Sequence, residues 1–385
     1  MRRPGLFLSL PKEIVVMAAR SRIRVALAVG ALVAPLAMVA AASAPASAGT
    51  PKHKHEMVLY KVESTVKLGG AGSEIDSPNQ SLRCNPGDYV LDGMWLVKHV
   101  DQYPPDPDDD PGNPSGGQYN DERDVWVQAS YPDQGDLRTW QFVFANKAYG
   151  DAQLRLAITC INGETQTAGQ GPGHLHKHQV KVRNLFAGGA ATVAHPWAGR
   201  FYVDSGTQGW GACQPGEYFV APGFDLGAPS YRLVGSYPST VNAGLSWAWE
   251  FAVANTVPVT PQPVNINVYG RCIDRKVVAN DGHRHSIAMV HAPGLPFGSW
   301  HESFISQMAY PAEVQYQCDQ DNTSLHNYKA MVGWFWMGTN WEHNWFLGME
   351  PRPKLRAFTF WNPSPGAAQV KFGTLCINAR TSNPV

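Results

Sequence analysis

The 385-residue sequence predicts an all-β protein made of three tandem, disulfide-stapled, β-sandwich-like repeats. Three observations point to this class: apolar and polar residues alternate with a period of two, six cysteines form three equivalent pairs, and 37 glycines and 30 prolines are frequent in the connections. No stretch after the expected leader has a helical period. Closure of the repeats around a pseudo-threefold axis is the alternative architecture, because similar units on short linkers can pack around one axis.

The expected strands recur in the same order along the chain. Segments 154–160 and 264–272 alternate apolar with polar residues, so each strand has one apolar face. The aromatic segments 140–146, 249–255 and 356–362 each end in Asn, which stands 14, 17 and 14 residues before a cysteine. These recurrences predict roughly five to seven short antiparallel strands in each repeat.

The cysteines are expected to form one disulfide bond within each repeat. The threefold recurrence selects the pairs Cys84–Cys160, Cys213–Cys272 and Cys318–Cys376. Bonds that close loops of this length stabilise a protein by about 4 kcal/mol in the chain-entropy model. The sequence contains no Cys-x-x-Cys motif, so a redox role is not expected.

Residues 1–48 are predicted to be a signal peptide, with Met17 as an alternative start. Arginines precede the apolar stretch 25–42, and Ala46-Ser47-Ala48 supplies small residues at the cleavage position. The repeats are then expected at 49–168, 169–279 and 280–385. No later stretch has the ~20 apolar residues that a membrane span requires. The sequence therefore predicts a secreted, extracellular protein.

Residues of the first repeat form a recognisable pattern: Cys84, Pro86-Gly87, Asp92-Gly93, Ser130-Tyr131-Pro132, Trp140, Asn146 and Cys160. This pattern resembles the Cys-paired β repeat of secreted actinobacterial proteins, which runs Cys-Pro-x-Gly, Gly-Gly, Ser-x-Pro, Trp, Asn and Cys. The second repeat is similar over its length, and the third only over its second half. The resemblance implies secretion and a disulfide-closed β module, and no particular chemistry.

The charge balance and the motifs exclude several functions. The 31 basic and 31 acidic residues cancel, so no broad basic surface for nucleic acid or anionic membrane is expected. No Gly-x-Ser-x-Gly motif occurs, and neither His55-Glu56 nor His301-Glu302 is followed by the second His of a zinc protease helix. A non-catalytic role is therefore favoured, with an extracellular hydrolase that lacks a recognisable motif as an alternative.

A His-x-His segment stands at the start of each repeat. Side chains at i and i+2 share a strand face roughly 6.5–7 Å apart, so two imidazoles can approach one ion. His174 and His178 would be about 13 Å apart, so segment 174–178 offers one pair. The candidate ligands for copper(II) or Zn²⁺ are His53, His55, His174, His176, His283 and His285. The alternative interpretation is solvated linker residues.

An acidic loop is inserted into the first repeat only. Its carboxylates at Asp106, Asp108 and Asp110 are candidate Ca²⁺ ligands, although Gly117 occupies the position of the bidentate Glu in an EF-hand. A solvated loop is the alternative.

The third repeat concentrates tryptophans, of which Trp334, Trp336, Trp341 and Trp345 are candidate ligand-stacking residues. An exposed aromatic patch of this size is typical of a binding surface, and burial in the core is the alternative. The favoured function is non-catalytic recognition at or outside the cell surface, with a glycan, an envelope polymer or a protein as partner and no nucleic acid. A secreted metal-binding protein is the second interpretation. The sequence predicts no oligomeric state.

Overall fold

The structure is a computed structural model that describes most of the chain after the first 54 residues. The described residues are 55–69, 75–76, 80–99, 125–146, 152–167, 177–191, 198–203, 213–227, 231–238, 249–255, 264–279, 284–292, 301–305, 311–320, 322–338, 341–342 and 344–381. Within these ranges the regular structure is β-strand, apart from one short 3₁₀ helix, so the predicted all-β class is confirmed. No helix in the described part is long and apolar enough to cross a membrane.

The strands follow the alternating segments of the sequence. They are β1 (His55–Glu56), β2 (Leu59–Leu68), β3 (Ile75–Asp76), β4 (Gln80–Arg83), β5 (Tyr89–His99), β6 (Val125–Pro132), β7 (Thr139–Asn146), β8 (Ala152–Ile161), β9 (Gln166–Thr167), β10 (His178–Gln179), β11 (Val182–Ala191), β12 (Ala198–Val203), β13 (Glu217–Asp225), β14 (Tyr231–Pro238), β15 (Trp249–Asn255), β16 (Val264–Asp274), β17 (Lys276–Ala279), β18 (Arg284–Ser286), β19 (Met289–Ala292), β20 (His301–Ile305), β21 (Ala312–Gln317), β22 (Tyr328–Met337), β23 (Trp345–Pro351), β24 (Leu355–Trp361) and β25 (Ala368–Asn378). The 3₁₀ helix η2 spans Thr323–Leu325.

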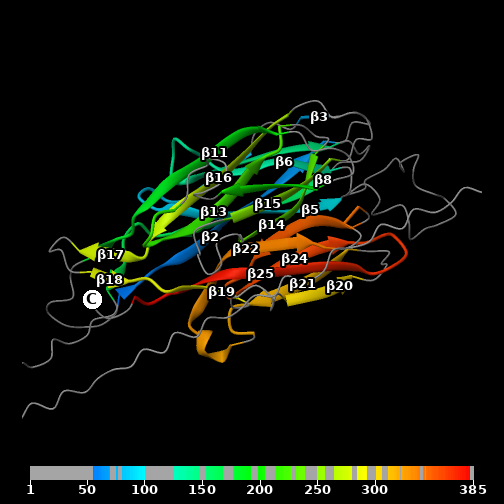
Figure 1. The fold of residues 1–385 in the computed structure, drawn as a ribbon. Helices are drawn as coiled ribbons and strands as arrows, with labels where there is room; N and C mark the ends of the chain where they lie inside the picture. Colours follow the sequence, from blue (N-terminus) through cyan, green and yellow to red (C-terminus); the bar gives the residue numbers. More distant parts are fainter. Residues whose placement is uncertain are drawn as a thin grey trace, which may run out of the picture. The chain divides into compact units, whose positions relative to one another are not determined.

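Three large antiparallel sheets contain most of these strands. Their orders are β2-β8-β5-β23-β24-β21, β11-β16-β13-β6-β7-β3 with β4 also on β7, and β12-β15-β14-β22-β25-β19 with β20 also on β25. Each sheet therefore joins strands from two of the predicted repeats: the first and third, the second and first, and the third and second. Figure 1 shows this mixing, with green β13 beside teal β6 and orange β22 beside green β14.

Each predicted repeat thus contributes one half-sheet to each of two sheets, and both half-sheets continue into a neighbouring repeat. The connectivity is cyclic, as the pseudo-threefold alternative requires. The residue boundaries of the repeats remain predictions, because the sheets do not divide the chain at those positions. The β-sandwich-like character lies in the pairing of two half-sheets, and not in three independent domains.

The three predicted disulfide bonds are all present, with Cα–Cα distances of 5.9, 5.4 and 5.9 Å. Two of them connect different sheets. Cys84 follows β4 and Cys160 lies in β8, whereas Cys318 follows β21 and Cys376 lies in β25. Each of these two bonds therefore connects the two half-sheets that come from the same predicted repeat.

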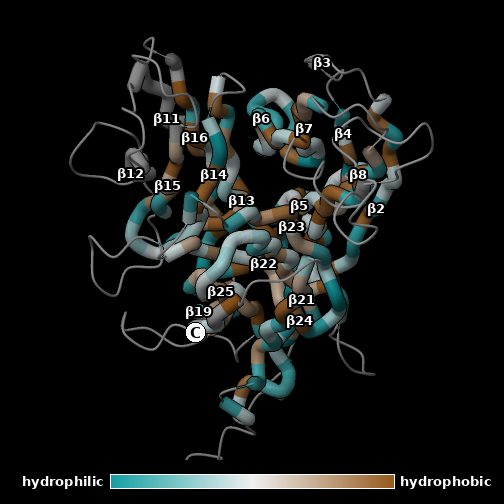
Figure 2. The backbone as a smooth tube through the Cα atoms, turned by 90° about the vertical axis from the view of Figure 1, so that its right-hand side faces the viewer, coloured by the Kyte–Doolittle hydropathy of each residue, from teal (hydrophilic) through white to brown (hydrophobic). Residues whose placement is uncertain are grey.

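The Ser-x-Pro and Trp positions of the sequence pattern meet in the core. The indole Nε1 of Trp140 donates to Ser130 Oγ at 2.9 Å, and Trp249 donates to Ser236 in the same way at 2.9 Å. Trp140 is fully buried against Gly93, where an added Cβ would lie 2.0 Å from the indole ring. Glycine at this position therefore lets the ring reach the backbone. Figure 2 shows the brown and teal segments that alternate along the strands around this core.

A buried ion pair joins the first and third predicted repeats. Asp92 in β5 lies 3.6 Å from Arg356 in β24, and both side chains are 1% exposed. Asp92 also accepts from the Gly333 N–H at 3.1 Å, while Arg356 donates to the Met331 carbonyl at 2.6 Å and to Thr159 Oγ1 at 2.9 Å. Burial raises the pKa of the Asp92 carboxyl, and the Arg356 charge opposes this shift.

We expect Asp92→Asn to lower the free energy of unfolding by about 3–5 kcal/mol, because it leaves the Arg356 charge buried without its counter-charge. The double variant Asp92→Asn/Arg356→Met removes both charges and is expected to recover most of this loss. Urea unfolding with the disulfides intact measures both effects.

The matched control is Glu63→Gln, which removes an exposed ion pair between Lys61 and Glu63. Such pairs contribute about 0–1 kcal/mol, so this variant should unfold nearly as the parent does. Equal losses for Asp92→Asn and Glu63→Gln would contradict the role assigned to the buried pair.

Candidate metal centre

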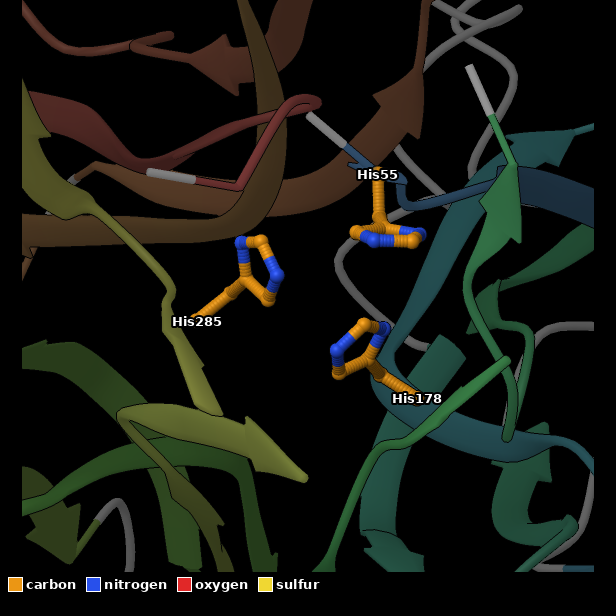
Figure 3. A group of neighbouring side chains, drawn as sticks. All are labelled: His55, His178 and His285. Atoms are coloured by element: carbon orange, nitrogen blue, oxygen red, sulfur yellow. The ribbon is translucent and has the colours of Figure 1, made fainter. Parts of the chain in front are cut away.

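Three histidines from three distant parts of the sequence converge in one buried cluster. His55 lies in β1, His178 in β10 and His285 in β18, and their side chains are directed into one space (Figure 3). The ring centroids are 4.1, 4.7 and 4.5 Å apart. One ring nitrogen of each histidine lies within 4.8 Å of the others. All three residues are at most 1% exposed.

The same backbone hydrogen bond positions each histidine strand. The N–H two residues after each histidine donates to the carbonyl three residues after a closing cysteine: Met57 to Ala379 at 2.7 Å, Val180 to Gly163 at 2.9 Å, and Ile287 to Arg275 at 2.7 Å. Each of these bonds joins one predicted repeat to the end of another. The three histidines therefore meet because three equivalent strand ends pair in a cycle.

Two threonine side chains fix the histidine backbones further. Thr381 Oγ1 accepts from the His55 N–H at 3.1 Å, and Thr165 Oγ1 accepts from the His178 N–H at 3.1 Å. The threonine N–H groups donate back to the histidine carbonyls, both at 2.9 Å. Val277 takes the equivalent place opposite His285 in the β17–β18 ladder.

Apolar residues surround the cluster, and the charged neighbours in sequence face away from it. Met57, Val180 and Ile287 follow on the same strand faces as the histidines and belong to the buried core. Lys177 and Arg284, which precede two of the histidines, are exposed, and Lys177 pairs with Glu164 at 2.7 Å. Each clustered histidine is therefore followed, two residues later, by a buried apolar side chain.

This arrangement is suited to one transition-metal ion. Imidazole nitrogens bind Zn²⁺ at about 2.0–2.1 Å, which places ligand atoms of one tetrahedral site about 3.4 Å apart. The nitrogens of the cluster lie within 4.8 Å of one another, so the rings must shift to bring them to that spacing. A water or a substrate group can occupy the fourth position of a three-histidine site.

The structure includes two of the six predicted ligands, His55 and His285, in the cluster. The other four, His53, His174, His176 and His283, lie outside the described residues. The choice of His174 and His176 in the second segment omitted His178, which is the residue that joins the cluster. One signal could have identified it: each clustered histidine is the last of its segment and stands two residues before a buried apolar residue.

A second group with metal-ligand chemistry is already engaged in other bonds. Cys213, Glu217 and Cys272 lie close together, but the two sulfurs form a disulfide bond. Glu217 accepts from Arg183 at 2.6 and 2.8 Å, and this pair lowers the pKa of the carboxyl against the effect of burial. The disulfide bond and the ion pair give this group a structural role.

The predicted tryptophan cluster is divided between the core and partly exposed positions. Trp334 is 4% exposed and packs against Gly373, where an added Cβ would lie 2.2 Å from the indole ring. Trp336, Trp341 and Trp345 are half-buried. Two of these rings contact cations, with Lys371 Nζ 5.2 Å from the Trp336 centroid and Arg232 Cζ 4.2 Å from that of Trp345. The four rings therefore do not form one open stacking surface.

The candidate calcium ligands Asp106, Asp108 and Asp110 and the predicted leader 1–48 lie outside the described residues. A comparison with models of known protein families gave no match, and a comparison with curated protein sequences gave none either. A function for this protein can therefore be inferred only from its own sequence and geometry.

Thr165→Val should lower the free energy of unfolding by about 1–3 kcal/mol, because the buried His178 N–H loses the hydroxyl that accepts its hydrogen bond. Valine occupies the equivalent position 277, so the change in side-chain shape alone should have little effect on the free energy of unfolding. Thr165→Ser keeps the hydroxyl and is the control. Urea unfolding that ranks the serine variant at or below the valine variant would contradict this role.

Proposed function

We propose that this protein is a secreted metal-binding protein that holds one divalent transition-metal ion between His55, His178 and His285. The convergence of three buried imidazoles from three separate strands is the observation that carries the proposal. A transition-metal ion such as Zn²⁺ can bind three imidazoles at once.

Zn²⁺ is the ion that this geometry favours. Three strand ends related by a pseudo-threefold cycle would supply three corners of a tetrahedron, the arrangement typical of Zn²⁺. Copper(II) prefers ligands in a square plane, which a threefold arrangement does not provide. Copper(II) still binds imidazole strongly, so both ions belong in the test.

An extracellular location completes the proposal. The three disulfide bonds fit an oxidising compartment, and the leader-like sequence at 1–48 supports export. An ion between the three histidine strands would connect residues of the first, second and third predicted repeats. Recognition of a glycan through the tryptophans receives less support, because Trp334 is buried and Arg232 lies over Trp345.

To test the proposal, untagged protein is equilibrated with Zn²⁺ or copper(II), the free ion is removed, and the metal content of the protein is measured. We expect about one ion per chain, because one group of three histidines forms one site. His178→Ala and His285→Gln should each weaken binding by at least about 100-fold, more than the loss of an outer-shell partner does. Binding should also weaken as the pH is lowered, since the imidazoles must be neutral to bind a metal.

The control is His326→Ala, which removes an exposed histidine outside the cluster. This variant should bind as the parent does, and circular dichroism should confirm that every variant is folded. Ion at 100 times its dissociation constant should stabilise the parent by about 2.7 kcal/mol and leave His178→Ala unchanged. Full stoichiometric binding by folded His178→Ala would refute the proposal.

A further inference from the structure

A second site lies farther along the sheets from the histidine cluster. A cavity of about 50 Å³ is lined by the first residues of three hairpin strands, Val125–Val127 of β6, Tyr231–Leu233 of β14 and Trp345–Leu347 of β23. Trp95 of β5 contributes another wall. Trp95 stands six residues beyond Tyr89, the end of β5 that is nearer to the histidine strands, which corresponds to about 20 Å of extended chain.

One partly buried cation, Arg232, lies in this apolar and aromatic wall. The Arg232 guanidinium lies 4.2 Å from the ring centroid of Trp345 and 5.7 Å from that of Trp341. Its Nη2 donates to the Trp341 carbonyl. Its Nε and Nη1 are buried, and no group in the described part of the chain accepts a hydrogen bond from them.

A second residue that lines the cavity also has a buried N–H donor with no acceptor among the described residues. The indole Nε1 of Trp95 is buried and has no acceptor among the described residues. Buried N–H groups in native proteins are nearly all hydrogen-bonded, so three such donors around one cavity call for an acceptor. The donors carry a net positive charge, which favours an anionic acceptor.

Among the described residues, Glu342 is the acidic group whose charge acts on Arg232. Burial lowers the pKa of the guanidinium to about 10, and the Glu342 carboxylate, which is exposed, opposes this shift only through its charge. Arginine remains protonated at that value, so the cavity holds a cation at neutral pH. A cation that is largely removed from water is costly unless an anion compensates it, and an anion that enters the cavity would do so.

We propose that this cavity binds the carboxylate of a ligand that has a flat apolar body. A planar carboxylate matches the donor fork of an arginine. The apolar body would pack against the half-buried ring of Trp126, which also lines the cavity. This site shares no residue with the histidine cluster, so it does not rest on the proposed metal function.

The test is titration of the full chain with benzoate, monitored by tryptophan fluorescence and by calorimetry. We expect benzoate to bind at least tenfold more tightly than benzamide, which has the same shape without the charge. Arg232→Gln should abolish this preference. Arg232→Met removes the buried cation with an apolar side chain of similar length and should remain folded without binding benzoate.

The matched control is Arg352→Gln, which removes an exposed arginine that pairs with Glu313 at 2.8 Å. This variant should bind benzoate as the parent does. A peptide that ends in phenylalanine, with its terminal carboxylate free or amidated, distinguishes a polymer-borne carboxylate from a free one. Equal affinities for benzoate and benzamide, or undiminished benzoate binding by Arg232→Gln, would overturn the proposal. The result does not depend on added metal, and titration in the presence of chelator checks this independence.

Discussion

The backbone pairing that closes the cycle of strands is the interaction on which the rest of the structure depends. The Met57 N–H donates to the Ala379 carbonyl, and the Thr381 N–H donates to the His55 carbonyl. Residues 55 and 381 are 326 positions apart in the sequence. The entropic cost of closing a loop grows only with the logarithm of its length, so a few well-placed hydrogen bonds and a buried core can hold such a closure. Without it, His55 would not reach the other two histidines.

Sheets that are shared between repeats bring backbone groups and charges into the junctions, and buried arginines satisfy them. Arg271 donates to the carbonyls of Val90, Asp133 and Asp136, at 3.0, 2.9 and 3.1 Å. Arg356 donates to Met331 beside the register shift in β22. A guanidinium has five donors in a rigid plane, which suits a site where several carbonyls converge. These two side chains therefore replace ladder hydrogen bonds that the strands cannot make at the junctions.

Much of the fold could be predicted from the sequence, because alternation and cysteine recurrence are local signals. The three disulfide bonds follow from the position of each cysteine within its repeat. The sharing of sheets could not be predicted, since a period of two shows which face of a strand is apolar but not which strand lies beside it. The spacing could not identify His178, because the pairs His174/His176 and His176/His178 both place two histidines at i and i+2. Nothing in the sequence indicates that Arg232 and Trp95 line a cavity, since an isolated arginine usually lies at the surface.

The cyclic pairing also sets the order in which the three histidine strands can pair during synthesis. His178 and His285 can take up their positions opposite Thr165 and Val277 once the chain extends through β18, at the start of the third repeat. His55 must wait for Thr381, which the ribosome adds more than three hundred residues later. Until residues 379–381 have been made, the histidine cluster is incomplete and the edge of β1 that does not face β9 is unpaired. Assembly of the cluster therefore requires residues from both ends of the segment 55–381.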